Sequence, residues 1–430
     1  MVTSKPPVSV ERRRSDPPGR GKRALSLGCR VDATAKPMVE LVLKHLPVLA
    51  AEAADFWLRH GLDRQHGGFH GHIDRRGLPG EPTDKGAIQQ ARHLWTWSSW
   101  YERREPTERA RRAAEAAFSF LVDHLLDPND GEFAYRSTRT GRVVDARKLL
   151  YAQAFSIYAL STYASVFGVP VARDLALRCF ESLDRRAHDD RYGGYDLSNE
   201  REWTSPGTEK ETNTHIHLME AFTALYAVTR DSRVEARLAE MSDLCATRLL
   251  QPSGYVHKEF LRDWTPHEVP SVSYGHDLET AWLLIDAELT LGQPRAHVVA
   301  AATRMACHAA HYGFDAERGG YFEEGIPHGG VTGFEKIWWV QFEALPGLWW
   351  TYRLTAETLY LERLLRTLEW IESDQRDTEH GEWFWGVLPD GGLGPNGGVK
   401  GGLWKAAYHN IRALTITEDW MLAALRQIAA

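Results

Sequence analysis

A histidine, a carboxylate and a tryptophan follow one another at intervals of three residues in the stretch SYGHDLETAW. His276, Glu279 and Trp282 can therefore share one flank of a helix. A carboxylate beside an imidazole holds its tautomer and raises its basicity, which suits a general base. This spacing predicts proton-transfer chemistry at the start of a helix.

A second histidine and carboxylate pair has the same kind of spacing. Asn213, His217 and Glu220 fall on one helix face, whereas His215 is two residues from His217 and points elsewhere. That geometry does not suit a metal site with two histidine ligands. We therefore predict no metal here.

Other chemistry-bearing residues occur in separate segments. Arg92 lies in an otherwise apolar helix, which favours an anionic or oxyanion partner over a simple ion pair. Trp339 precedes Glu343 by four residues, so the two are helix neighbours. His409 lies in an aromatic helix start that follows a glycine-rich stretch.

A glycine-aromatic mark recurs along the chain, and it relates these segments to one another. The steps between the leading glycines are 64, 62, 61, 65 and 62 residues. A nearly constant period indicates one supersecondary unit copied along the chain. The six marks are Gly67-Gly68-Phe69, Gly131-Glu132-Phe133, Gly193-Gly194-Tyr195, Gly254-Tyr255, Gly319-Gly320-Tyr321 and Gly381-Glu382-Trp383.

The apolar spacing between the marks is helical, so each mark joins two helices. Six helical hairpins make twelve helices, and the sixfold count favours closure into a double ring. We predict an all-α fold, an (α/α)6 barrel. The predicted outer helices are 37–60, 107–126, 170–186, 232–250, 294–312 and 357–373, and the inner ones are 84–104, 148–168, 212–230, 276–292, 336–354 and 405–428.

Polar residues recur at a similar distance from each mark, 22 to 28 residues after its leading glycine. In a closed ring, equal register means equal height along the axis, so these side chains are predicted to line one pocket. They are Arg92, Gln153, His217, His276, Glu343 and His409.

Bulk properties narrow the class of protein. The chain has 430 residues and a formal charge of -7 with both signs interspersed, so neither nucleic acid nor a membrane is a predicted partner. Its four cysteines lack CxxC spacing, which favours a reducing cytoplasm. We expect residues 1–36 to be a disordered arm and 37–430 a single catalytic domain, as a monomer or homodimer.

Five segments together resemble the N-acylglucosamine 2-epimerase superfamily, and within it the cellobiose 2-epimerases. The resemblance runs from about residue 40 to the C-terminus. It is carried by the helix that contains Arg92 and by the segments NTHIHLMEAF, SYGHDLETAW, KIWWVQFEAL and WKAAYHNIRA. An (α/α)6 barrel is also the fold that this resemblance implies.

The resemblance implies a reaction and a role for each site residue. A sugar that epimerises at C2 loses its C2 proton, forms a cis-enediolate and is reprotonated on the opposite face, without a cofactor. His276 and His409 match the family's two bases, His217 assists ring opening, and Arg92 stabilises the enediolate oxygen. The implied substrate-binding residues are Asn213, Glu279, Trp282, Trp339, Glu343, Trp404 and Tyr151.

The sequence is compatible with more than one substrate and more than one reaction. The chain departs from the cellobiose enzymes at Ala406-Ala407, where they have Cys-Pro, and in the glycine-rich stretch 391–402, which we expect to be a mobile lid. Both departures lie where a second sugar unit would sit, so the expected substrate is a disaccharide such as cellobiose or a related sugar. Alternatives are an aldose-ketose isomerase, an inverting glycoside hydrolase that uses Glu279 and Glu343, and a non-catalytic binding protein.

Overall fold

The computed structural model describes residues 27–28, 31–197, 207–268 and 270–428. Most of the predicted arm, residues 1–36, lies outside these ranges. The arm and the single-domain organisation of residues 37–430 stay predictions.

Helices occupy most of the described chain and alternate between two rings, as predicted. In those residues there are twelve α-helices. The outer ones are α2 (Lys36–His60), α4 (Glu108–Phe120), α6 (Pro170–Ala187), α8 (Ser232–Leu244), α10 (Ala296–Tyr312) and α12 (Leu359–Trp370). The inner ones are α3 (Ala87–Arg103), α5 (Leu150–Phe167), α7 (Thr212–Thr229), α9 (Tyr274–Leu291), α11 (Trp338–Thr355) and α13 (Tyr408–Ile428).

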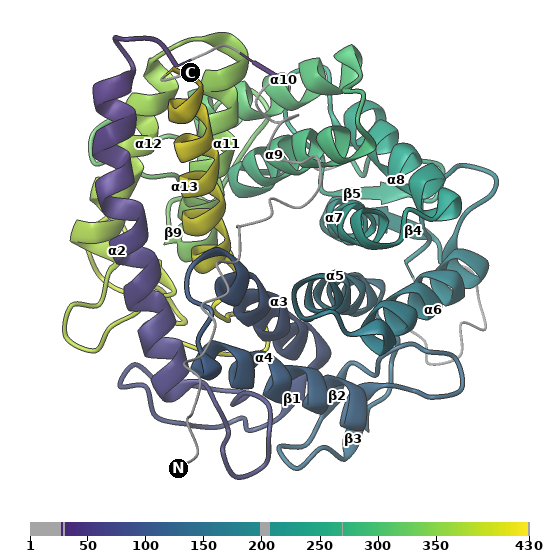
Figure 1. Cartoon of the computed structure of the whole chain (residues 1–430). Coiled ribbons are helices and arrows are strands. Elements are labelled where there is room, and N and C mark those ends of the chain that lie inside the picture. Colours follow the sequence, from purple (N-terminus) through teal and green to yellow (C-terminus); the bar gives the residue numbers. More distant parts are fainter. Residues whose placement is uncertain (1–26, 29–30, 198–206, 269, 429–430) are drawn as a thin grey trace, which may run out of the picture.

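The inner ring is closed. Each inner helix packs against the next, and α13 packs against α3, while α2 packs against α12 and α13 to close the outer ring. Figure 1 looks into this double ring, with the six inner helices around the centre. The prediction of an (α/α)6 barrel is confirmed.

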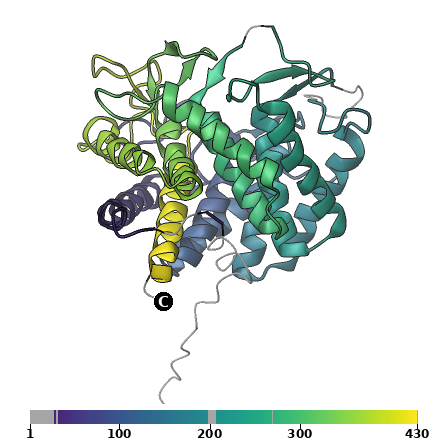
Figure 2. The same cartoon turned by 90° about the horizontal axis from the view of Figure 1, so that it is seen from above.

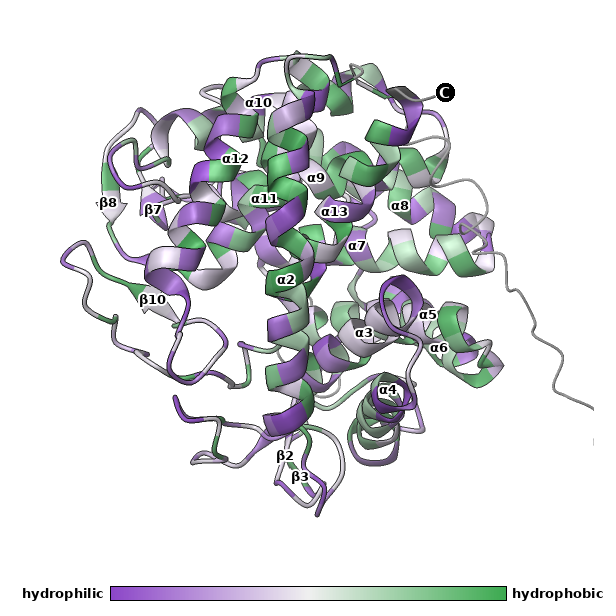
Figure 3. Cartoon of the chain, turned by 60° about the vertical axis from the view of Figure 1, so that its left-hand side comes forward, coloured by the Kyte–Doolittle hydropathy of each residue, from purple (hydrophilic) through white to green (hydrophobic). Residues whose placement is uncertain are grey.

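The two rings differ in how their helices are buried. Outer helices bury one face, as α2 does with Val39, Val42, Leu46 and Leu49. Figure 3 shows α2 with alternating apolar and polar bands. Inner helices such as α5 are buried on nearly all sides, because they lie between the outer ring and the barrel centre. None of the helices in the described ranges is long and apolar enough to span a membrane.

Three outer helices end in a π-helical turn directly before their mark. These turns are η1 (Leu121–Leu125), η2 (Cys245–Leu249) and η3 (Ile371–Gln375). Each follows α4, α8 or α12 without a break. The predicted ends at 126 and 250 include η1 and η2, whereas the predicted end at 373 falls within η3.

Each glycine-aromatic mark is a tight turn held by the following inner helix. The leading glycines have φ between 75° and 105°, a conformation that glycine adopts at little cost. In five repeats, an inner-helix side chain accepts a hydrogen bond from the backbone N–H two residues after that glycine. These anchors are Gln90, Gln153, His215, Asp277 and Gln341.

This anchoring corrects one prediction. Gln153 was expected to line the central pocket, but its Oε1 accepts from Phe133 N at 2.7 Å and its Nε2 donates to Phe133 O at 2.8 Å. The backbone of a mark buried in the barrel wall needs these partners. Gln153 therefore supports the fold.

Short strands, which the all-α prediction lacks, join neighbouring repeats at the end where the inner helices begin. Segments before the inner helices pair with segments after the next mark, so β1 pairs with β2 and β6 with β7. Figure 2 shows the strands at the end opposite the C-terminus of α13. The strands are β1 (Lys85–Gly86), β2 (Arg136–Ser137), β3 (Val143–Asp145), β4 (Glu209–Glu211), β5 (Glu259–Leu261), β6 (Val272–Ser273), β7 (Glu324–Gly325), β8 (Val331–Gly333), β9 (Lys336–Ile337) and β10 (Gly386–Val387).

The glycine-rich stretch 391–402 connects the last repeat to the first. The backbone N–H groups of Lys400 and Gly401 donate to Ile73 O, and Ile73 N donates back to Gly401 O. Lys400 Nζ also lies 3.0 Å from Asp377 Oδ2. The end of the stretch is thus held in place, and its mobility as a lid stays a prediction.

Candidate active site

One level of the inner ring carries the central polar cluster. Five of its members follow an anchoring residue by two positions, so they turn from the mark toward the barrel axis. The sixth, Arg412, follows Asn410 by the same interval. The Arg92 guanidinium lies 4.5 Å from the ring centre of Phe155, and that ring lies 4.7 Å from the ring of His217. This level comprises Arg92, Phe155, His217, Glu279, Glu343 and Arg412.

Arg412, which the sequence prediction missed, is the centre of this level. Its side chain is fully buried and bonds to three carboxylates from three inner helices. Nη1 donates to Glu220, and Nη2 donates to Glu279 and, at 2.6 Å, to Glu343 Oε1. One guanidinium therefore fixes the relative positions of α7, α9, α11 and α13.

Two of the three carboxylates, Glu220 and Glu279, differ in charge state although both bond to Arg412. Burial raises the pKa of Glu279 to about 7, and the nearby Glu343 carboxylate adds to the rise. Burial also acts on Glu220, but Arg412 and His217 outweigh it and lower its pKa to about 2. At neutral pH, Glu220 is ionised and Glu279 is close to its titration point.

His409 is oriented by Glu343. Its Nδ1 lies 2.7 Å from Glu343 Oε1, and the ring is 6 % exposed. Because a carboxylate accepts, Nδ1 carries the proton and Nε2 keeps its lone pair. Burial, Arg92 and Arg412 hold the pKa of His409 well below its usual range, so the imidazole is neutral.

His217 is oriented in the same way by Glu220. Its Nδ1 lies 2.9 Å from Glu220 Oε2, and the hydroxyl of Tyr408 donates to the same carboxylate at 2.8 Å. Tyr408 directly precedes His409, so the two histidine and carboxylate pairs are connected through α13.

His276 differs from both. Its Nδ1 is buried without a hydrogen-bond partner in the described structure, and the ring is half-buried. Burial, with contributions from Lys258 and His217, lowers the pKa of His276 to about 3. Glu279, expected to hold this imidazole, instead bonds to Arg412, because the guanidinium is the stronger partner for a buried carboxylate.

Trp339 lies between the two histidines assigned as bases. Its ring centre is 4.9 Å from that of His276 and 5.9 Å from that of His409. The two histidines occupy matching positions, three residues before Glu279 and Arg412 respectively. Both rings therefore lie one helical turn toward the strand-bearing end of the barrel.

Arg92 is held from two sides and keeps one donor unused. Nη2 donates to the Tyr151 hydroxyl at 2.8 Å, and Nη1 donates to the carbonyl of Trp404. Nε is buried and has no partner among the described residues. The Trp404 side chain is 45 % exposed, with its ring centre 5.7 Å from that of Tyr151.

The two remaining predicted residues have different surroundings. Trp282 is only 2 % exposed, and its indole N–H donates to Glu343 Oε2 at 2.9 Å. Asn213 is half-buried one turn before His217 on α7. The substrate roles assigned to both stay predictions.

Ligand atoms of Glu279, Glu343 and His409 lie within 4.8 Å of one another, a spacing that a metal ion could bridge. Arg412 Nη2 already donates to both carboxylates, and Glu343 Oε1 is shared with His409 Nδ1. A positive charge thus occupies the centre of this group. The prediction of no metal is left as a prediction.

The fold and site together define an (α/α)6-barrel protein with imidazole and carboxylate pairs on the inner helices. The model of the N-acylglucosamine 2-epimerase (GlcNAc 2-epimerase) family matches residues 67–413. The chain belongs to this family and is an enzyme of the isomerase class, an epimerase. The resemblance seen in the sequence is confirmed.

Individual relatives agree with this assignment. The cellobiose 2-epimerase of Bacteroides fragilis is 33 % identical over 380 residues, covering 85 % of this chain and 95 % of that protein. The structure of cellobiose 2-epimerase from Spirochaeta thermophila matches with a TM-score of 0.84 and 31 % identity, covering 92 % and 100 %. A D-mannose isomerase structure matches with a TM-score of 0.80, covering 87 % and 96 %, but at 20 % identity it shows the fold alone.

Proposed function

We propose that the enzyme interconverts the glucose and mannose configurations at C2 of a reducing-end sugar through a cis-enediolate. The observation that carries this proposal is the pair of neutral imidazoles, His276 and His409, on either side of Trp339. Inversion at C2 requires a base on each face of the sugar. An imidazole with a lowered pKa is unprotonated at neutral pH and can accept the C2 proton.

The environment of each base suits both directions of proton transfer. His409 has its Nδ1 bonded to Glu343, so Nε2 is the atom that takes or returns a proton. A protonated imidazole in a site that lowers its pKa is a strong acid, which favours return of the proton to the enediolate. No cofactor takes part in this scheme.

Arg92 supports the intermediate. Enolisation places negative charge on the sugar oxygens, and a fixed guanidinium stabilises such charge. Tyr151 and the Trp404 carbonyl hold Arg92, whose Nε donor is buried without a partner among the described residues. His217 has its Nδ1 bonded to Glu220, so Nε2 is the atom that can transfer a proton during ring opening.

A disaccharide such as cellobiose is the proposed substrate. The relatives from Bacteroides fragilis and Spirochaeta thermophila are named for cellobiose. Trp404 offers an exposed aromatic face beside Tyr151, and sugars stack on such faces. Ala406 and Ala407, which replace the usual Cys-Pro, are buried, so they act on this region through packing.

Incubation with cellobiose, lactose, glucose and mannose in deuterated water tests the activity. We expect the C2 epimer of at least one sugar, with deuterium at C2. Absence of both from all four sugars would refute the proposal. A ketose as the main product would instead identify an aldose-ketose isomerase, in which the proton returns to C1.

Hydrolysis is the less favourable alternative. The carboxylates of Glu279 and Glu343 have oxygens within 4.8 Å of each other, whereas an inverting hydrolase separates its carboxyl groups by roughly 6.5–9.5 Å. Both are also bonded to Arg412. Release of glucose from cellobiose in the same incubation would favour hydrolysis.

A further inference from the structure

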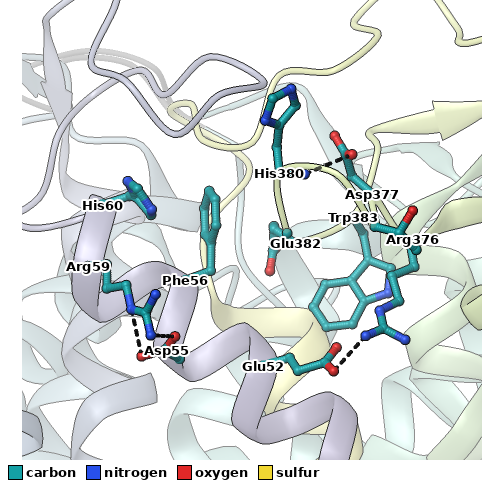
Figure 4. Close-up of a pocket in the computed structure, with 12 residues that line it drawn as sticks. Glu52, Asp55, Phe56, Arg59, His60, Arg376, Asp377, His380, Glu382 and Trp383 are labelled. Atoms are coloured by element: carbon teal, nitrogen blue, oxygen red, sulfur yellow. Dashed lines mark hydrogen bonds and ion pairs between the residues drawn. The ribbon is translucent and has the colours of Figure 1, made fainter.

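A pocket of about 240 Å³ lies where the last repeat meets the first, apart from the histidine cluster. It is lined by α2 and by the sixth glycine-aromatic mark. In Figure 4, Phe56 stands between the two sides, Glu52 reaches Arg376, and Glu382 and Trp383 belong to the mark. This is the seam at which the outer ring closes.

Three other marks carry an arginine at the corresponding place. Arg178, Arg304 and Arg366 each precede the leading glycine of their own repeat by fifteen residues, and each lies beside the previous mark. Their Nη2 groups donate to the carbonyls two and three residues before the leading glycine of that mark. The acceptors are Pro128 and Asn129, Gln251 and Pro252, and Ala316 and Glu317.

At the seam, a glutamate replaces this arginine. Glu52 precedes Gly67 by the same fifteen residues, and the corresponding carbonyls belong to Thr378 and Glu379. Glu52 has no proton to donate to them and instead accepts from Arg376 Nη2 at 2.6 Å. In the described residues, the two carbonyls of the sixth mark lack the guanidinium that covers those of the second, fourth and fifth marks. The first and third marks lack it too, because Ala116 and Ala239 stand at that position, so an acidic side chain there is particular to the sixth mark.

The second mark shows the filled arrangement, because it has the same Gly-Glu-aromatic sequence as the sixth. Its Glu132 accepts from Ser182 Oγ at 2.7 Å and lies 3.7 Å from Arg186 Nη1. The residues at those two positions of α2 are Phe56 and His60. At the seam, a phenyl ring therefore stands in place of the hydroxyl, and an imidazole and a carboxylate stand in place of the two guanidinium groups.

One acceptor of the sixth mark has no donor, because Glu382 Oε2 is buried without a hydrogen-bond partner among the described residues. Glu382, the counterpart of Glu132, is 3 % exposed, lines the pocket and accepts from Asn410 Nδ2 at 2.8 Å. Arg75 already donates to the carboxylates of Asp377 and Glu379. The two arginines in the pocket wall are already paired, Arg59 with Asp55 and Arg376 with Glu52.

We propose that the seam pocket binds an alkylguanidinium group, with its N–H donors on the carbonyls of Thr378 and Glu379. A planar guanidinium has five N–H donors and can bond to two separate carbonyl oxygens at once, which suits this pair better than an ammonium group does. The group would take the place that Arg178, Arg304 and Arg366 fill at their own marks. Phe56 offers the ring against which its alkyl stem packs.

The probe is n-propylguanidinium, which reproduces an arginine side chain from Cβ outward. Saturation-transfer NMR on the full chain should show saturable binding with a dissociation constant on the order of 1 mM. Glu52→Arg fills the site from within, and Glu52→Met blocks it without donors, so each should abolish the signal. Unchanged epimerisation by both variants, whose substitutions lie outside the cluster, shows that they are folded.

The double variant Glu52→Arg with Arg304→Ala is the matched control. It closes the seam and leaves an alanine beside the fourth mark, as the first and third marks have, so no signal should return. A signal from the double variant, or none from the unsubstituted protein, would overturn the proposal. Equal signals from the unsubstituted protein and Glu52→Met would also overturn it, because the probe would then bind elsewhere.

Discussion

One carboxylate oxygen joins Arg412 to His409. Glu343 Oε1 lies 2.6 Å from Arg412 Nη2 and 2.7 Å from His409 Nδ1, so it accepts from both. The guanidinium fixes the carboxylate, and the carboxylate fixes the tautomer of the imidazole. The orientation of the proposed base thus depends on a residue that does not itself need to touch the sugar.

Glu343→Gln should disturb the orientation of His409 while leaving sugar binding largely intact. The glutamine amide carries no charge to hold His409, and its NH2 end cannot accept from the Trp282 indole as Glu343 Oε2 does. We expect kcat to fall by roughly 10²–10⁴-fold with KM changed much less. Steady-state kinetics on the epimerised sugar checks this. Glu288→Gln, at a buried carboxylate paired with Arg295, is the control and should keep kcat. Wild-type kcat in Glu343→Gln would rule out the orienting role.

Arg412→Met should destabilise the barrel strongly. It leaves Glu220, Glu279 and Glu343 buried without their shared cation, and breaking a buried ion pair costs about 3–5 kcal/mol. Urea unfolding measures the loss. Arg237→Met, at a partly exposed pair with Asp184, should cost less. A loss below about 1 kcal/mol at Arg412 would contradict the central position of this guanidinium.

Glu279 should make the stability of the folded protein fall as the pH rises. Its folded pKa of about 7 exceeds the ordinary value of 4.5. The group's contribution to stability is complete below pH 4.5 and is lost as the pH rises through 7. Glu279→Gln does not titrate, so its melting temperature relative to the unsubstituted protein should rise between pH 4.5 and 7.

Thermal melts at pH 5 and pH 8 test Glu279→Gln, and a further melt at pH 3 tests the control. Glu220→Gln is the control with the opposite sign, since the folded pKa of Glu220 is lowered to about 2. Its stabilisation is present above pH 4.5 and is lost as the pH falls toward 2. A constant difference for Glu279→Gln across the range would contradict the raised pKa.

Gln153→Leu tests the distinction between anchors and site residues. The substitution leaves the N–H and C=O of Phe133 without partners, at about 1–3 kcal/mol each. We expect lower stability in urea with kcat unchanged at a temperature where the variant is folded. A loss of kcat without a loss of stability would return Gln153 to the catalytic pocket.

The periodicity of the marks was sufficient to predict the barrel and the helix order. The leading glycines keep nearly constant spacing, because each must adopt the same positive φ at the same point of the hairpin. The strands escaped prediction because they are two or three residues long and pair across repeats. Such pairs leave no alternating pattern in the sequence.

The site was predicted in part. Counting from the marks located Arg92, His217, Glu343 and their level of the barrel, but it also selected Gln153. On each inner helix, the residue that faces the mark and the residue that faces the barrel axis are only two positions apart in sequence. The distance from the leading glycine does not show which of the two lines the pocket. Counting from the polar residue that contacts the mark would have found Arg412, which follows Asn410 by two positions as Glu343 follows Gln341. Asn410 donates to the Glu382 side chain of its mark, whereas Gln341 accepts from a backbone N–H.

The two-base mechanism is tested most directly by deuterium exchange at C2 in His276→Ala and His409→Ala. Each variant is incubated in deuterated water, separately with cellobiose and with its C2 epimer. Neither should epimerise, and each should exchange the C2 proton of only one of the two sugars, a different one for each variant. Exchange from both sugars in either variant, or continued epimerisation without one of the histidines, would contradict the mechanism.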